Sequence, residues 1–219
     1  MRIGILGSTG PAGSALGARL ASVGYDVVLG SRSMDRAAEI RDTILGRWPD
    51  RDLPVTAADN AGAAEADVVV VATPWDGAAP TVHALAAQLD GKVLISIANA
   101  LARVGSEFEP LVPPRGSIAA HVQAAVPDSF VVAAYHHLPA KELGNLEHTV
   151  DSDVLICSDH PDAMKVVFEI TEKIPGCRPL DAGELSNAMA IESFTAVLLQ
   201  LNVRYKTRVA PRLTGINNA

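Results

Sequence analysis

The sequence predicts an α/β protein in which a doubly wound parallel sheet is followed by a small C-terminal α/β extension. Three observations carry this prediction. Short apolar runs alternate with helical segments through the first half of the 219-residue chain. These runs are rich in Val, Ile and Leu, as in parallel strands that helices cover on both faces. A long helical segment with apolar residues on nearly every side closes the chain, which is typical of a buried helix.

The first half of the chain divides into five strands and four helices. Residues 2–6 form a short apolar run that ends in glycine, and the next segment places Leu16, Leu20 and Val23 on one helical face. Ser33 and Asp59 are suited to cap the second and third helices. Strands are expected at residues 2–6, 26–30, 55–58, 67–72 and 92–97, and helices at 14–23, 34–48, 60–66 and 74–89. Right-handed crossovers between such strands give a doubly wound sheet.

The second half is less regular. Helices are expected at residues 117–125, 161–174 and 185–205, strands at 131–134, 154–157 and 178–180, and a loop at 135–145. We therefore expect residues 1–135 to form the main domain. Residues 136–219 are expected to complete a second pocket and to carry a dimer interface on the apolar helix of residues 185–205, which makes a homodimer the expected assembly.

Composition narrows the class of protein. Hydrophobic residues make up 48% of the chain and charged residues 20%, which suits a packed core. The formal net charge of −7 and the absence of a Lys/Arg block in the first two hundred residues argue against a general nucleic-acid binder. The longest apolar run, Val68 to Ala72, is too short to span a bilayer. Cys157 and Cys177 lack metal-ligand spacing, so we expect a soluble cytoplasmic protein without a metal site or membrane partner.

The C-terminal end has a charge bias of its own. Acidic residues stop at Glu192, whereas four basic residues follow it. One interpretation is a solvated tail, because termini are often poorly tied down. The other is a local patch for an anionic ligand. The basic residues are Arg204, Lys206, Arg208 and Arg212.

The strongest functional signal is a glycine-rich segment between the first strand and the first helix. It reads Gly7-Ser8-Thr9-Gly10-Pro11-Ala12-Gly13. Glycines allow a tight turn and a close approach of the backbone to a pyrophosphate, which then lies against the unpaired amides of the helix N-terminus. Gly13 would let this helix pack closely on the sheet. Because strand, loop and helix follow in the required order, the segment predicts a Rossmann-type dinucleotide site.

The end of the second strand indicates which dinucleotide binds. Sites that prefer NAD usually place an acidic residue there, to bind the ribose hydroxyls. Here the chain reads Gly30-Ser31-Arg32, and Arg36 follows one helical turn later. One hydroxyl and two guanidinium groups suit the 2′-phosphate of NADP. The alternative is that both arginines are merely solvated, but no carboxylate competes, so NADP is the expected cofactor.

Two further strand ends lie at the same edge of the predicted sheet. The fourth strand ends at Ala72-Thr73-Pro74-Trp75, which we expect to border the adenosine or ribose. The fifth ends near Ala98 and Asn99, which would lie closer to the nicotinamide. Trp75 is as well explained by packing as by cofactor contact. Asn99 is as well explained by capping of a loop as by cofactor contact.

Several blocks together resemble the NADPH-dependent coenzyme F420 reductases, or F420:NADP oxidoreductases, along almost the whole chain. They are Gly7-Ser8-Thr9-Gly10, Gly30-Ser31-Arg32, Thr73-Pro74-Trp75, His136-His137-Leu138-Pro139-Ala140 with Asn145, Pro179-Leu180-Asp181-Ala182-Gly183, Leu185-Ser186-Asn187 and Glu192-Ser193. The first two blocks occur in many reductases, whereas the later ones in this order are more specific. Ser8, in place of a second glycine, and residues 98–114 depart from the family pattern.

The resemblance implies reversible hydride transfer between NADP(H) and the deazaflavin ring of coenzyme F420. It also implies that residues 7–13 with Ser31, Arg32 and Arg36 hold NADP, and that His136, His137, Leu138 and Pro139 lie against the deazaflavin. Ser186 and Asn187 would help to close that pocket. Such a transfer needs two rings held face to face, and no protein nucleophile or metal, so no catalytic side chain is expected.

Several roles are compatible with the adjacent histidines, His136 and His137. Either could be a proton donor, an ordinary hydrogen-bonded loop residue or part of a ring-binding wall. With the resemblance, a cofactor-contacting His136 is favoured and His137 is left open. The competing functions are an NADPH-dependent reductase of an imine, a carbonyl, another flavin or a metal chelate, and a non-catalytic NADP-sensing module.

Overall fold

The protein, described here by a computed structural model over residues 1–216, is built on a six-stranded sheet in the order β3-β2-β1-β4-β5-β8. All neighbouring strands in it are parallel. The strands are β1 (Arg2–Leu6), β2 (Asp26–Ser31), β3 (Val55–Asp59), β4 (Val68–Val71), β5 (Val93–Ser96) and β8 (Phe130–Ala133). The expected doubly wound parallel sheet is therefore confirmed, and each predicted strand lies within two residues of its expected bounds.

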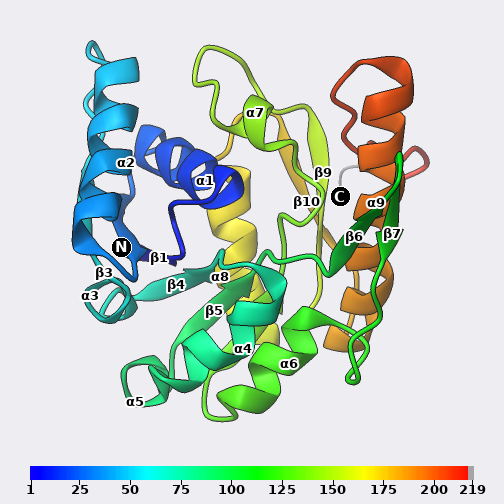
Figure 1. Cartoon of the computed structure of the whole chain (residues 1–219), viewed down its shortest axis with the longest axis horizontal. Coiled ribbons are helices and arrows are strands. Elements are labelled where there is room, and N and C mark those ends of the chain that lie inside the picture. The colour runs from blue at the N-terminus through cyan, green and yellow to red at the C-terminus, as the bar shows by residue number, and fades with distance from the viewer. Residues whose placement is uncertain (217–219) are drawn as a thin grey trace.

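Helices cover both faces of the sheet (Figure 1). In β4, Val68 and Val70 belong to one hydrophobic cluster and Val69 and Val71 to the other, because successive side chains of a strand point to opposite faces. The first cluster includes residues of α1 (Pro11–Ser22), α2 (Met34–Arg47) and α8 (Pro161–Glu172). The second includes residues of α3 (Asn60–Ala64), α4 (Trp75–His83), α5 (Ala86–Leu89) and α6 (Ile118–Ala125).

The C-terminal extension adds a second, smaller parallel sheet. It consists of β9 (Ser152–Ile156) and β10 (Cys177–Asp181), which α8 connects. An antiparallel bridge between Ala133 and Cys157 joins this sheet to the end of β8. The chain then continues through a 3₁₀ turn, η1 (Leu185–Asn187), into the long helix α9 (Ala188–Tyr205). The predicted extension and its terminal helix are both present.

Two local predictions were wrong, and one element was missed. The single helix expected at residues 74–89 is broken into α4 and α5, because Leu85 leaves helical geometry with φ −114° and ψ 14° while it packs against the core. The loop expected at residues 135–145 contains a short helix, α7 (Ala140–Leu143). A hairpin of β6 (Leu101–Val104) and β7 (Glu107–Pro110) was not predicted, since its residues are mostly exposed and lack apolar alternation.

The long helix α9 is buried on one side only within a single chain. Ile191, Glu192 and Leu198 face the interior, whereas Phe194 and Val197 are 39% and 51% exposed. An apolar outer face on a helix that is otherwise packed is a common feature of subunit interfaces. None of the described helices is long and apolar enough to cross a membrane.

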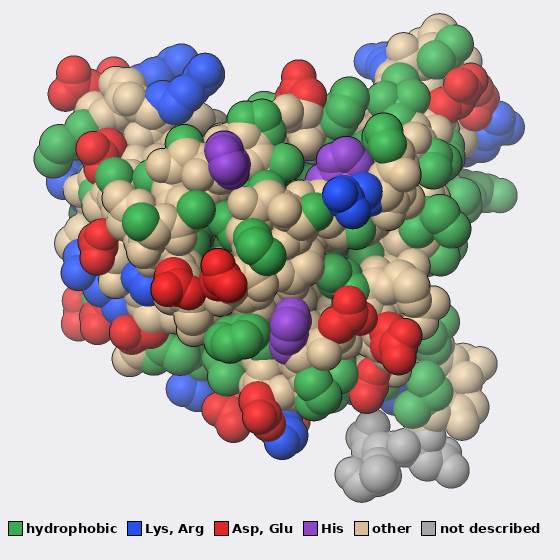
Figure 2. Space-filling view, turned by 90° about the horizontal axis from the view of Figure 1, so that it is seen from below, with side chains coloured by type: hydrophobic (Ala, Val, Ile, Leu, Met, Phe, Trp, Pro, Cys, Tyr) green, Lys and Arg blue, Asp and Glu red, His purple; other side chains and the backbone are tan. Residues whose placement is uncertain are grey.

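The four basic residues after Glu192 are all exposed, and Lys206 forms no ion pair within residues 1–216. Three of them form ion pairs with acidic residues elsewhere in the fold: Arg204 with Glu107, Arg208 with Glu142, and Arg212 with Asp151 and Asp153. These contacts hold the tail against the body of the protein. Figure 2 shows acidic, basic and apolar side chains interspersed over the underside of the molecule, with no continuous basic patch on that face.

Candidate functional site

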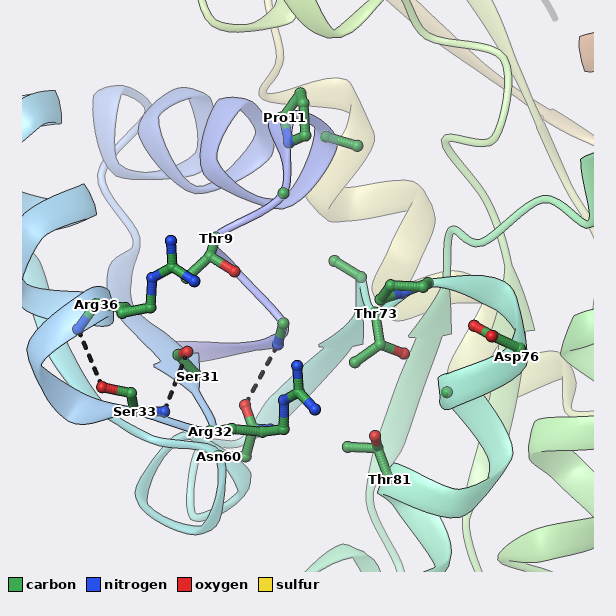
Figure 3. A pocket seen from close by; sticks show the side chains of 16 residues that line it. Thr9, Pro11, Ser31, Arg32, Ser33, Arg36, Asn60, Thr73, Asp76 and Thr81 are labelled. Atoms are coloured by element: carbon green, nitrogen blue, oxygen red, sulfur yellow. Dashed lines mark hydrogen bonds between the residues drawn. The ribbon is translucent and has the colours of Figure 1, made fainter. Parts of the chain in front are cut away.

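A pocket of about 820 Å³ opens at the carboxyl edge of the main sheet, where ligands bind in doubly wound folds. Its walls come from the loop after β1, the end of β2, the start of α3 and the turn between β4 and α4 (Figure 3). Of the residues predicted for the dinucleotide, eleven line it: Gly7, Thr9, Gly10, Pro11, Ala12, Ser31, Arg32, Arg36, Ala72, Thr73 and Pro74.

The glycine-rich loop has the geometry that an anion site requires. Gly7 has φ +74°, and a Cβ there would lie 2.9 Å from the backbone nitrogen of Thr73. Its own amide donates to Asn60 Oδ1 at 3.3 Å. Gly10 is the N-cap of α1 and Pro11 follows it, and no side chain caps the first turn. The amides of that turn therefore face the pocket without a side-chain partner, as in phosphate-binding helix N-termini.

Two of the predicted loop residues act from beneath the pocket. Ser8 is fully buried, and its amide donates to the carbonyl of Gly30 at 2.9 Å, which ties the loop to β2. Gly13 is buried in α1, where an added Cβ would lie 3.0 Å from the Cβ of Ala72. Gly13 thus permits the close approach of α1 to Ala72, the residue that follows β4, in agreement with the close packing on the sheet that the sequence predicts.

Replacing Gly7 with alanine is expected to weaken dinucleotide binding at least tenfold and to lower the free energy of unfolding by about 2 kcal/mol, because a left-handed φ and a clash combine there. Binding is measured by titration with NADPH, and stability by urea unfolding. Gly24→Ala is the matched control: Gly24 has φ +91° but open space around its Cβ position. It should lose stability and keep its affinity. Equal loss of affinity in both variants would contradict the role given to the Gly7 loop.

The end of β2 presents two cationic side chains to the pocket. Ser31 Oγ accepts from the amide of Ser33 at 3.3 Å, and Ser33 Oγ caps α2 by accepting from the amide of Arg36 at 3.4 Å. This pair of caps fixes the turn from which Arg32 and Arg36 project (Figure 3). Both arginines are exposed, and within residues 1–216 neither forms an ion pair. Two unpaired guanidinium groups at this place suit a phosphate ligand.

Other lining residues were not predicted from the sequence. They are Ser33, Asn60, Asp76, Gly77 and Thr81. Asn60 could have been found, because it follows β3 at the same edge of the sheet as the other ligand residues. Thr81 lies inside α4, and its place in the pocket depends on how that helix packs, for which the sequence holds no local signal.

The residues of the turn after β4 line two different cavities. Thr73 and Pro74 line the large pocket, and Thr73 Oγ1 is buried without a hydrogen-bond partner among the described residues. Trp75 lines a neighbouring cavity of about 390 Å³ instead, together with Ala100 and the apolar residues of the segment 111–114. Asp76 borders both cavities, so they adjoin at the start of α4.

Ala98 and Asn99 lie beyond the wall of the large pocket, after β5. Ala98 is buried. Asn99 Nδ2 donates to the carbonyl of His136 at 3.0 Å, so this side chain does brace a loop, while its Oδ1 is buried without a partner among the described residues. Asn99 thereby connects the end of β5 to the residues that follow β8.

The two histidines point to different parts of the fold. Tyr135, just before them, has φ +62°, an uncommon conformation for a residue with a side chain. His137 Nε2 lies 2.8 Å from the carbonyl oxygen of Asp153 in β9, whereas His136 Nε2 lies 3.8 Å from Glu192 Oε1 in α9. Burial lowers the pKa of His136 to about 3 and also lowers that of His137. Both rings are neutral at pH 7, so neither is a cationic acid.

The remaining predicted residues lie around this turn and at η1. Leu138 is buried, and Pro139 is the N-cap of α7. Ser186 and Asn187 are exposed, and Asn187 Nδ2 donates to the carbonyl of Ala182 at 2.6 Å. None of these four residues lines the two adjoining cavities. Among residues 1–216, no group of three or more His, Cys, Asp or Glu side chains is arranged to hold a metal ion.

The six-stranded order, the glycine loop at the start of α1 and the pocket at the carboxyl edge define a Rossmann-type dinucleotide-binding class of protein. Residues 2–100 match the family described as "NADP oxidoreductase coenzyme F420-dependent". The chain is 34% identical to an F420-dependent NADP reductase of Methanocaldococcus jannaschii, with 95% of each chain covered. It is 35% identical to that of Methanothermobacter marburgensis, with 99% of each covered. The chain therefore belongs to the F420-dependent NADP reductase family and is an oxidoreductase.

More distant relatives share part of this architecture. Rat metalloreductase STEAP3 is 31% identical over 90% of this chain, which corresponds to 37% of the relative. Among solved structures, that of a putative F420-dependent NADP reductase from Arthrobacter sp. FB24 superposes with a TM-score of 0.81 at 24% identity, covering 95% of this chain and 96% of the other. At that identity the likeness shows the fold.

Proposed function

We propose that this protein transfers hydride reversibly between NADP(H) and coenzyme F420. The observation that carries the proposal is the pocket in which the uncapped N-terminus of α1 and the unpaired Arg32 and Arg36 face one cavity, in a chain of this family. A pyrophosphate and a 2′-phosphate are the two anionic groups of NADP, and the cavity offers one cationic or amide-lined place for each.

The residues present fit NADP. Residues 7–13 with the α1 amides would hold the pyrophosphate, and Ser31, Arg32 and Arg36 would hold the 2′-phosphate. The space that a Cβ at Gly7 would fill is needed for the backbone of Thr73, whose buried Oγ1 is without a partner among residues 1–216 and is available to the ribose or diphosphate. Thr73, Pro74 and Trp75 would border the adenosine side, and Ala98 and Asn99 the nicotinamide side.

The second cofactor is assigned to the residues that follow β8 and to η1. His136 to Pro139 would lie against the F420 ring, with Ser186 and Asn187 at its edge. Buried polar atoms without a partner in the described part of the chain support a ligand at this place: Asn99 Oδ1 and both ring nitrogens of His136. Residues 1–135 would thus form the NADP domain, and the C-terminal part, expected at 136–219, would complete the second pocket; its last three residues lie outside the described ones.

The protein's contribution to the reaction is positional. NADP(H) and F420 supply the hydride donor and acceptor themselves, so the chain needs to hold two rings face to face and exclude water. His136 is neutral at pH 7 because its burial lowers its pKa to about 3. It can therefore pack against a ring or accept a hydrogen bond, but it does not deliver a proton as an imidazolium ion.

The test is a spectrophotometric assay with purified protein, NADPH and oxidised F420, beside NADH and flavin controls. Loss of the visible deazaflavin band with NADPH, and much slower loss with NADH, is the expected result. Tight NADPH binding without any F420 reduction would overturn the F420 assignment and leave an NADPH-dependent reductase of another acceptor, or a binding module, to be distinguished with imines, quinones and flavins.

We also propose that the protein is a cytoplasmic homodimer. The outer face of α9 carries Met189, Phe194 and Val197, which are 39–51% exposed in the single chain. The two free cysteines are in keeping with a reducing compartment.

Replacing Phe194 and Val197 together with glutamate is expected to convert the dimer to a monomer, because two carboxylates would lose their hydration in an apolar interface. Light scattering after size-exclusion chromatography measures the mass. Met34→Glu is the control, since Met34 is 62% exposed on α2, at the opposite end of the molecule (Figure 1). A wild-type monomer, or an unchanged dimer in the double variant, would contradict the proposed interface.

A further inference from the structure

A buried carboxylate of α9 holds the start of α6. Glu192 is only 4% exposed, and its Oε2 and Oε1 accept hydrogen bonds from the amides of Ile118 at 2.8 Å and Ala119 at 3.0 Å. The Oγ of Ser117 accepts from the next amide, that of Ala120, at 3.0 Å. An ionised carboxylate only accepts hydrogen bonds, so it can serve both amides at once.

The same stretch of α9 also holds His136. The ring Nε2 lies 3.8 Å from Glu192 Oε1, and neither ring nitrogen has a hydrogen-bond partner among residues 1–216. One turn further along α9, Thr195 Oγ1 donates to the carbonyl of His136 at 3.3 Å. Asn99 Nδ2 donates to the same carbonyl from the other side. The ring and the backbone of His136 therefore both meet α9.

This contact acts on a strained turn. Tyr135 is a non-glycine residue in the left-handed region, and such a conformation persists only where the surrounding structure holds it. Its hydroxyl is 2.8 Å from Thr171 Oγ1 in α8, and His137 is bound to β9 through the carbonyl of Asp153. With α9 on the remaining side, the turn is held from three elements at the carboxyl end of β8. That strand end lies beside the end of β5.

We propose that Glu192 is a positioning residue for the hydride acceptor: its ionised carboxylate fixes the start of α6 and the turn of His136, which together shape the F420 side of the site. This proposal rests on the proposed function. Glu192 would act through His136 and α6 without touching the acceptor itself. The structure supplies the connection through four contacts: two amides of α6, the ring of His136, and the neighbouring Thr195 hydroxyl on the His136 carbonyl.

The electrostatic surroundings make this position sensitive to pH. Burial raises the pKa of Glu192 to about 7, although its two amide contacts oppose the shift. The titratable groups that face it are His136 and Cys157; His137 is turned to β9, and His121 of α6 accepts from the amide of Arg115. A protonated Glu192 would lose one acceptor for α6 and gain a proton that His136 Nε2 can accept. The ionised form, which suits the two amide contacts, is therefore expected to prevail as the pH rises above about 7.

The experiment compares wild type, Glu192→Gln and Glu169→Gln, whose glutamate is exposed on α8. Oxidised F420 is titrated without NADPH from pH 5.5 to 8.5, and NADPH binding and kcat/KM are measured in parallel. We expect Glu192→Gln to weaken F420 binding about tenfold at pH 8, the value of one charge-assisted hydrogen bond, and to leave NADPH binding unchanged. The difference in F420 affinity between wild type and Glu192→Gln should disappear as the pH falls through about 7, because Glu192 of the wild type then becomes protonated. At each pH, the F420 dissociation constant of Glu192→Gln is divided by that of wild type, so any titration of F420 itself cancels.

A second variant covers the case in which Glu192→Gln folds poorly. Thr195→Val keeps the side-chain volume and removes the hydroxyl that binds the His136 carbonyl, so it should weaken F420 binding about threefold without moving the pH midpoint. An unchanged F420 affinity in both variants would overturn the role of Glu192, as would a parallel loss of NADPH binding. Failure of the wild type itself to bind and reduce F420 would overturn the proposed function instead.

Discussion

The double variant Arg32→Ala/Arg36→Ala is expected to bind NADPH about 100-fold more weakly than wild type and to bind NADH almost unchanged. Each guanidinium on a phosphate contributes about 1.5–3 kcal/mol, and two such contacts exceed a factor of one hundred even at the lower estimate. NADH lacks the 2′-phosphate, so its binding does not depend on these two contacts. The variant should therefore discriminate poorly between the two dinucleotides.

Dissociation constants from fluorescence titration of both dinucleotides provide the measurement. Arg41→Ala is the matched control, because Arg41 lies on the same helix and pairs with the adjacent Asp42, outside the pocket. It should bind both dinucleotides as wild type does. If the double variant loses NADH and NADPH affinity in equal proportion, the arginines support the loop as a whole, and the assignment of the 2′-phosphate to them is wrong.

Removal of the Asp153 side chain is expected to produce the largest loss of stability, about 3–5 kcal/mol, as for other broken buried ion pairs. The Asp153 side chain has no exposed surface. Its two oxygens accept from Arg178 at 2.8 and 2.7 Å, from Arg212 at 2.9 Å and from the amide of Leu213 at 2.6 Å. Asp153→Ala would leave two cations without their shared partner and release the tail from β9. Urea unfolding at pH 7 measures the change.

The Asp153 carboxylate should also make the free energy of unfolding depend on pH. The hydrogen bonds from Arg178 hold the pKa of Asp153 far below its usual range, so the folded state favours the ionised form. Its stabilising contribution is fully present above the unfolded pKa of about 3.9 and is lost as the pH falls through the lower, folded value. Wild type should lose stability below about pH 4 more steeply than Asp153→Asn does.

Asp151→Ala is the control for both measurements. Asp151 pairs with Arg212 as Asp153 does, but its side chain is 76% exposed, and exposed pairs contribute about 0–1 kcal/mol. A small loss at pH 7 is therefore expected for this variant. If Asp151→Ala and Asp153→Ala lose the same free energy of unfolding, the tail is not anchored through the buried carboxylate.

The sequence predicted the main sheet well because its signals are local. Continuous apolar runs such as Val68 to Val71 specify buried parallel strands, and caps such as Ser33 and Asp59 mark helix starts that the structure confirms. The hairpin of β6 and β7 escaped prediction, since its strands pair with each other and are largely exposed, so no apolar alternation marks them.

The dinucleotide pocket was predictable for a related reason. Gly7, Gly10 and Gly13 follow a strand and open a helix, and the structure shows a left-handed φ at Gly7 and a close helix contact at Gly13. The contact between Glu192 and His136 joins residues 56 positions apart, and the partners of the basic tail are equally remote. Only the packing of α9 and β9 brings these groups together, so no spacing in the chain reveals them.

We expect hydride to pass directly between NADPH and F420 while one protein holds both. The most direct test is a single-turnover reaction with NADPH deuterated at nicotinamide C4, followed by mass spectrometry of the reduced F420 with each of the two C4 epimers. Deuterium from one epimer is expected to appear in F420 without exchange with solvent. Reduced F420 that carries only solvent hydrogen, or no reduction by either epimer, would contradict it.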